Sequence, residues 1–261
     1  MGLFNMHYDR PGPGVNPDTP RKKGAARFAE VLGRDMLSFW CAGMLALLSA
    51  LPFALGLILS LLTHAVLPML LAGALGGMIA APQLAGLQDT ILRSLRDEPG
   101  YWWATYRQVW KRNLKGSLLP GAVGGLILAM QIFAAWHLGT GQGSLLAVLV
   151  IGLVLLGGLT QYLFAQVALL DLPFASLLKN AVLLFFGYLP RTLLGVLWQG
   201  VYWGLVVGFF PYSVPVLLIT GLWLPALLSL MAIYPPLEKS FHIEETIRKM
   251  REDQLNGQDP S

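Results

Sequence analysis

Six long apolar stretches alternate with short polar connections along the 261-residue chain. A helix that crosses a bilayer core of about 30 Å needs about 20 apolar residues, and each stretch is close to that length. The stretches are apolar all round, whereas a helix of a soluble protein keeps a polar outer face. We therefore predict an all-α fold with six transmembrane helices, at residues 36–62, 65–88, 117–138, 144–170, 193–210 and 214–234.

The composition agrees with a membrane location. Hydrophobic residues make up 55% of the chain and charged residues 12%, whereas about a quarter of the residues in soluble proteins are charged. The chain is thus predicted to be a polytopic membrane protein. It would have an N-terminal tail at residues 1–35, a membrane domain at 36–234 and a C-terminal tail at 235–261.

Charged residues are confined to alternate connections. Of the 18 Lys and Arg, six precede the first predicted span, six lie between the second and third, two lie between the fourth and fifth, and four follow the sixth. The connections at His64, 139–143 and 211–215 carry no charged residue. Because Lys and Arg are retained on the cytoplasmic side, we predict three hairpins with both termini in the cytoplasm.

The connection at residues 97–116, DEPGYWWATYRQVWKRNLKG, is both aromatic and basic. At 100° per residue, its aromatic residues fall on one side of a helix and its basic residues on the other. This pattern predicts a cytoplasmic amphipathic elbow helix at the membrane surface, facing anionic headgroups, a partner protein or both; a solvated loop is the alternative. The expected contact residues are Trp102, Trp103, Tyr106, Arg107, Trp110, Lys111, Arg112 and Lys115.

Similar elbows are expected before the first and fifth spans. An offset of 74 residues aligns Asp97 and Pro99 with Asp171 and Pro173. The alignment predicts three repeats, each an elbow followed by a helical hairpin, and chance similarity is the alternative.

Small residues recur at helical spacing in three spans. Gly200, Gly204 and Gly208 form a GxxxGxxxG pattern, and Gly121 with Gly125 repeats the spacing, as does the pair at 73 and 77. Such stripes let two helix backbones approach closely. We predict helix packing within the chain at these glycines, with a homodimer face as the alternative.

The predicted spans contain no Asp, Glu, Lys or Arg, which disfavours ion-coupled or proton-coupled transport. His64 and His137 lie at the outer ends of the second and third spans, where interfacial packing is favoured over a proton relay. Gln131, Gln161 and Gln199 suit a polar path for a small neutral solute, but hydrogen bonds between helices explain them equally well. A facilitator or channel is therefore one alternative function.

No catalytic motif occurs in the chain. There is no GxxxxGK[ST] for nucleotide phosphates, no HExxH and no GxSxG. Cys41 is the single cysteine, so it has no second thiol for a disulfide or a metal pair. The sequence thus predicts no catalytic residue, cofactor or metal, and no nucleic-acid partner, since the basic residues flank spans and suit anionic lipid headgroups. A membrane enzyme acting on a lipid-linked substrate is the second alternative.

Three blocks of the sequence resemble the YesL-like family of small bacterial integral membrane proteins. The first is the N-terminal run YDRPGPGV at residues 8–15. The second covers the end of the second span and the elbow, and the third precedes the fifth span. The residues in matching places are Pro82, Ala85, Gly86, Arg96, Asp97, Trp110, Asn113 and Ser117 in the second block, and Asn180, Leu189, Pro190 and Arg191 in the third.

The resemblance implies a multi-pass protein of the bacterial cytoplasmic membrane. Family members have no assigned mechanism or catalytic residues, and they are often encoded beside ABC-type carbohydrate uptake systems. The expected function is a non-enzymatic accessory protein whose partner is an ABC sugar-importer permease.

Overall fold

A computed structural model describes residues 21–98, 101–139 and 142–256, with side chains described up to residue 249. Across this part of the chain the secondary structure is helical, with no strand. The elements are α1 (Gly24–Ser49), α2 (Leu51–Thr63), α3 (Val66–Leu71), the π-helical turn η1 (Ala72–Gly76), α4 (Gly77–Leu95), α5 (Trp102–Trp136), α6 (Gly143–Leu169), α7 (Phe174–Gly187), α8 (Leu189–Gly208), α9 (Val214–Thr220), α10 (Trp223–Phe241) and α11 (Ile243–Asn256).

Four of the described helical segments are long and apolar enough to cross a membrane: α1, α3 to α4, α5 and α6. Two further pairs pass only as bent units, α7 with α8 at 100° and α9 with α10 at 55°. The all-helical class is therefore confirmed, with four to six candidate spans.

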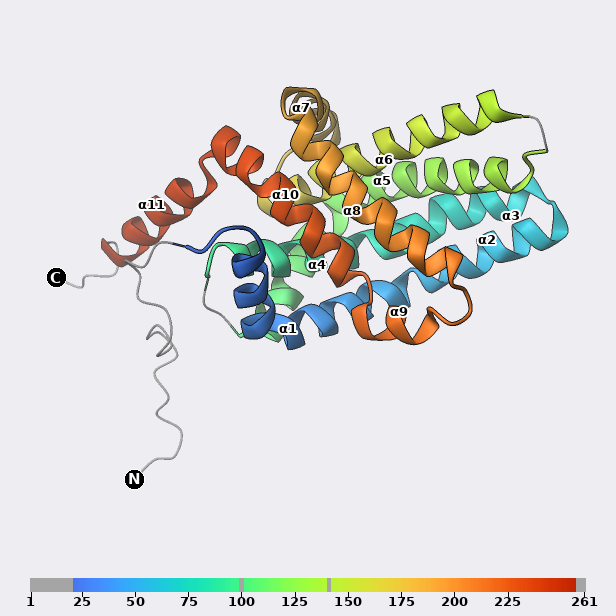
Figure 1. Ribbon diagram of the computed structural model, residues 1–261. Coiled ribbons are helices and arrows are strands. Elements are labelled where there is room, and N and C mark those ends of the chain that lie inside the picture. The colour runs from blue at the N-terminus through green and yellow to red at the C-terminus, as the bar shows by residue number, and fades with distance from the viewer. Residues whose placement is uncertain (1–20, 99–100, 140–141, 257–261) are drawn as a thin grey trace.

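The helices form one elongated bundle whose two ends differ in chemistry (Figure 1). At one end, hydrogen bonds join Arg21 to Asp97 and to Glu244, so the start of the described chain, the α4–α5 connection and the start of α11 lie together. We call this the charged end. At the other end the α2–α3 and α5–α6 turns meet through His64 and His137. We call this the uncharged end.

The centre of the bundle is a close crossing of α5 with η1 and α4. A Cβ atom added at Gly77 would overlap the carbonyl oxygen of Gly121, and one added at Gly125 would overlap that of Gly73. Only glycine lets the two backbones come this near. The prediction of helix packing at Gly121 and Gly125 is confirmed.

The stripe of Gly200, Gly204 and Gly208 behaves differently. Nothing lies within 4 Å of a Cβ atom built at any of the three, so they face open space on α8. Packing of this stripe within the described chain is therefore a wrong prediction. The buried residues of α8 are Thr192, Gly195 and Tyr202, and these lie on other faces of the helix.

The aromatic elbow at 97–116 is not a separate helix, which corrects that prediction. From Trp102 the chain runs as one helix of 35 residues to Trp136. Pro120 removes only one backbone hydrogen bond, which this long helix tolerates between packed neighbours. The elbow predicted before the fifth span is present, since α7 ends at Gly187 and α8 begins with Pro190 in its first turn. The elbow predicted before the first span is not separate, because α1 runs unbroken from Gly24 to Ser49.

Two predicted spans are interrupted. The stretch 36–62 is divided at Ala50, after which α2 begins with Pro52 in its first turn. The stretch 214–234 is divided at Gly221, whose φ of 51° and ψ of −145° suit glycine alone. As a result α10 begins at Trp223 and runs to Phe241, seven residues past the predicted end at 234.

Candidate functional site

The aromatic side of α5 packs against α4. Tyr106 is 4% exposed, and its hydroxyl donates a 2.6 Å hydrogen bond to Gln83 Oε1. Gly86 makes room for the ring, because a Cβ there would lie 2.7 Å from it. Trp102 packs on the same core. Tyr106 is therefore out of reach of lipid or a partner, which corrects its predicted role. Of the predicted aromatic contact residues, Trp103 stays exposed, at 48%, and the neighbouring Tyr101 is exposed at 73%.

The basic side of α5 points outward. Arg107, Lys111 and Lys115 are exposed, and none of them pairs with an acidic side chain in the described structure. With Trp103 they are spaced four residues apart, which aligns them along one side of the helix. We call these four residues the basic strip. A shallow groove beside it is lined by Ala104, Arg107, Gln108 and Lys111.

Arg112 and Trp110 differ from the strip. Arg112 donates a 2.8 Å hydrogen bond to the carbonyl oxygen of Ala168, which ties α5 to the last turn of α6. Trp110 is half-buried, and its indole N–H has no partner in the described structure. These two predicted contact residues thus serve packing at least in part.

Asp97 is the centre of an ion-pair network at the charged end. Arg21 and Arg27 each donate to Asp97 Oδ2 at 2.8 Å, and Arg34 donates to Oδ1. Asp97 has a φ of 59°, a left-handed conformation that Asp adopts more readily than most residues. The network fastens the start of α1 to the α4–α5 connection.

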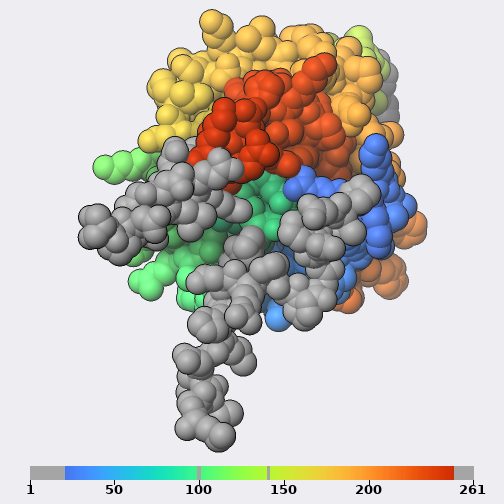
Figure 2. Space-filling view, turned by 90° about the vertical axis from the view of Figure 1, so that its left-hand side faces the viewer, coloured from blue at the N-terminus to red at the C-terminus, as the bar shows by residue number. Residues whose placement is uncertain are grey.

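The network continues to the C-terminal helices. Arg21 also donates to Glu244 Oε1 at 2.6 Å, and the Tyr234 hydroxyl donates to the same oxygen at 2.6 Å. Glu238 accepts from the backbone N–H of Glu244 at 3.2 Å. Figure 2 faces this end and shows blue α1, green-teal α4 to α5 and red α10 to α11 meeting on one surface.

Electrostatics favour the charged form of Asp97. Burial alone would raise its pKa, but the hydrogen bonds and charges of Arg27 and Arg34 outweigh burial, so the pKa of Asp97 lies below its ordinary value. Burial likewise opposes the charge of Arg21, and its contacts with Glu244 and Asp97 outweigh that cost and raise its pKa. The ion pairs therefore stay charged at neutral pH.

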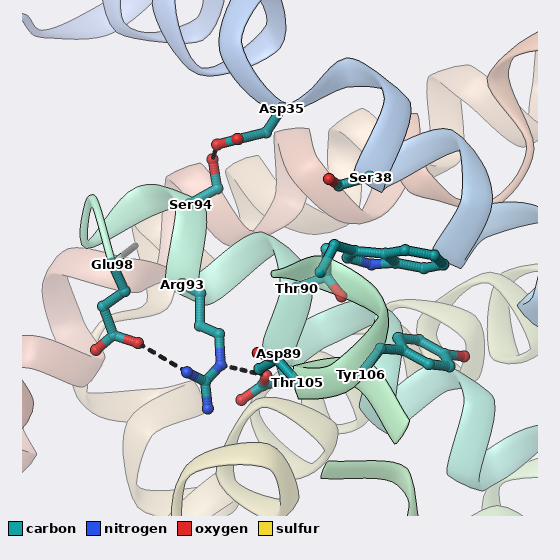
Figure 3. Close-up of a pocket in the computed structure, with 10 residues that line it drawn as sticks. Asp35, Ser38, Asp89, Thr90, Arg93, Ser94, Glu98, Thr105 and Tyr106 are labelled. Atoms are coloured by element: carbon teal, nitrogen blue, oxygen red, sulfur yellow. Dashed lines mark hydrogen bonds and ion pairs between the residues drawn. The ribbon is translucent and has the colours of Figure 1, made fainter. Parts of the chain in front are cut away.

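Beside the network lies a small pocket between α1, α4 and α5 (Figure 3). Arg93 crosses it, donating to Asp89 at 2.7 Å and to Glu98 at 3.4 Å, while Ser94 donates to Asp35. Its volume is about 60 Å³, the share of about two waters and far below the ~300 Å³ of small ligand pockets. The other lining residues are Ser38, Thr90, Trp102, Thr105 and Tyr106.

Chemically, this pocket suits structural water better than a substrate. Two of its carboxylates are already held by a guanidinium and a third by a hydroxyl. Across the described residues, no group of three or more His, Cys, Asp or Glu is arranged to hold a metal ion.

The three glutamines of the predicted polar path do not share one face. Gln161 is 3% exposed and lies with Ser229 against Gly195, and Gln199 donates to the Ser229 hydroxyl at 3.3 Å. Gln131 instead packs on Gly152. Gly152 and Gln161 are nine residues apart on α6, which places them about 180° apart around the helix axis. A single path lined by Gln131, Gln161 and Gln199 is therefore a wrong prediction.

The Asp97 network was missed by sequence reasoning, which counted its arginines only as charges flanking a span. A signal was present. Arg27 and Arg34 are seven residues apart, so they share one side of a helix, and Asp97 lies in a connection predicted to be at the same membrane face. The sequence pattern does not show that the arginines of α1 pair with an aspartate more than 60 residues further along the chain.

Comparison with known proteins adds no identity, since no family model, no curated protein and no solved structure matches the chain.

Proposed function

We propose that this protein is a non-enzymatic accessory subunit of the bacterial cytoplasmic membrane that binds the permease of an ABC-type carbohydrate importer. Its termini and the charged end would lie in the cytoplasm. The resemblance to the YesL-like family suggests the partner, and the basic strip supports a docking role.

The basic strip carries the proposal because its positive charges are available to a partner. By contrast, Arg21, Arg27 and Arg34 form ion pairs with Asp97 within the chain. Arg107, Lys111 and Lys115 are exposed and without acidic partners in the described structure. Cations flanking an exposed Trp suit a complementary acidic surface, and Trp and Arg are enriched at the centres of protein interfaces.

No specific observation favours either alternative function, a solute facilitator or an enzyme acting on a lipid-linked substrate. A facilitator would need its polar side chains along one path, and Gln131 lies on the other side of α6 from Gln161. An enzyme acting on a lipid-linked substrate would need a larger polar cavity than the pocket of about 60 Å³ beside Asp89.

Charge reversal tests the docking role. The variant Arg107→Glu/Lys111→Glu/Lys115→Glu should lose co-purification with the permease from sugar-induced cells in mild detergent, while its amount in the membrane stays unchanged. The control Lys179→Glu/Arg191→Glu/Lys239→Glu changes the net charge equally at three exposed positions away from the strip and should retain the partner. Recovery of no permease subunit with the wild-type chain, or equal recovery with both variants, would refute the proposal.

A further inference from the structure

The uncharged end brings two histidines from distant turns into contact. His64 directly follows α2, and His137 directly follows α5. His64 Nδ1 lies 2.9 Å from His137 Nε2. The ring planes are inclined at 73°. Both rings are exposed, so dissolved ions can reach them.

A second contact orients His137. Its Nδ1 lies 2.8 Å from the carbonyl oxygen of Phe133. A carbonyl oxygen only accepts hydrogen bonds, so Nδ1 carries the proton and Nε2 presents a lone pair toward His64. Metal-ligating histidines are held in this way, with the second ring nitrogen donating to a carbonyl or carboxylate.

From this geometry we propose that His64 and His137 together bind a divalent transition-metal ion, such as Zn²⁺, Ni²⁺ or Cu²⁺, which links the α2–α3 and α5–α6 turns. Imidazole nitrogens suit these metals. Two nitrogens bound tetrahedrally at about 2.0–2.1 Å from Zn²⁺ lie about 3.4 Å apart. The present separation of 2.9 Å therefore needs to widen by only a fraction of an ångström.

The tautomers of the two histidines and the lack of nearby charged residues are compatible with metal binding. His64 becomes a ligand at Nδ1 when its proton moves to Nε2, the other tautomer of the neutral ring. No Lys, Arg, Asp or Glu occurs in residues 51–88 or 117–170, so no charge in these segments repels the ion or competes for it. Water would complete the coordination. The inference does not depend on the proposed accessory function.

The test measures thermal unfolding of the full chain in detergent, with and without each metal, in a His7→Gln/Cys41→Ser background that leaves His242 as the one histidine outside the pair. Metal at ten times its dissociation constant should raise the midpoint by about 3–6 °C. His64→Asn and His137→Gln should each abolish the rise, as should the double variant. His242→Gln, a histidine at the other end, should keep it. Asparagine is chosen at position 64 because the φ of 54° there is left-handed.

Several outcomes would overturn the inference. They are no rise with any of the three metals, a rise that survives either single substitution, or a rise accompanied by doubling of the particle mass, which would place the ion between copies. If His64→Asn lowers the unfolding midpoint without metal, the metal-induced rise is compared between His137→Gln and the unsubstituted histidine pair. The electron paramagnetic resonance spectrum of bound Cu²⁺ gives a second readout. The signal of two coordinated imidazole nitrogens should be lost in His137→Gln.

Discussion

At the scale of single residues, Asp97 shows how one carboxylate organises the charged end. It accepts hydrogen bonds from three arginines while its backbone is left-handed. Hydrogen bonds to charged groups are stronger than neutral ones, and the Arg27 side chain is only 9% exposed. Loss of the carboxylate charge would thus leave a nearly buried guanidinium without its main counter-charge.

Asp97→Asn should therefore destabilise the protein. Asparagine tolerates the left-handed backbone, so the change removes the charge and one acceptor oxygen without straining the chain. We expect a loss of about 2 kcal/mol in the free energy of unfolding, below the ~3–5 kcal/mol of a fully buried pair, because Arg21 and Arg34 stay partly exposed. Denaturant unfolding in detergent measures it. Asp171→Asn, at an exposed position, should have little effect, and equal losses in both variants would contradict the role of Asp97.

The same residue predicts a pH dependence. The pKa of Asp97 is lowered in the folded state, while the unfolded chain has the ordinary Asp value of about 3.9. Its stabilisation is therefore complete above about pH 5 and declines as the pH falls through the folded pKa. The difference in unfolding free energy between wild type and Asp97→Asn should be level from about pH 5 to 7 and shrink below about pH 4. A difference unchanged down to about pH 3 would show that Asp97 does not titrate in this way.

At the scale of helices, apolar length and glycine spacing predicted part of what is seen. The third and fourth spans are single helices, and the crossing at Gly121 and Gly125 is as expected. Breaks were not predictable from apolarity, because Gly221 depends on a backbone angle that a hydropathy pattern does not contain. The aromatic side of α5 was assigned to lipid, since amphipathicity shows that a face is apolar but not whether lipid or α4 covers it.

The two glycine stripes should respond oppositely to one added methyl group. Gly77→Ala would force the Cβ into the carbonyl of Gly121 and should cost about 1–3 kcal/mol through overpacking. Gly204→Ala meets nothing within 4 Å and should be neutral or stabilising by up to about 1 kcal/mol through helix propensity. Unfolding measurements on the monodisperse protein compare them. A loss on Gly204→Ala as large as on Gly77→Ala would indicate that a second copy or a partner covers α8.

At the scale of the whole molecule, the ion pairs and the alternation of charge are independent arguments about the same surface. Arg21 bonded to both Asp97 and Glu244 requires the two described ends of the chain to lie at one end of the bundle, whichever way the bundle faces. The positive-inside rule adds the direction, since the connections at His64 and 211–215 carry no charge. Together they predict a cytoplasmic charged end.

Cysteine labelling in intact cells separates these two arguments. In a Cys41→Ser background, an impermeant maleimide should label Tyr212→Cys, whose native residue is 86% exposed in the uncharged connection between α8 and α9. Lys22→Cys and Glu245→Cys should react only after permeabilisation. Labelling of both of these in intact cells would reverse the orientation but keep the ion-pair geometry. Labelling of one without the other would contradict the network itself, because Arg21 cannot reach Asp97 and Glu244 from opposite sides of a bilayer core about 30 Å thick.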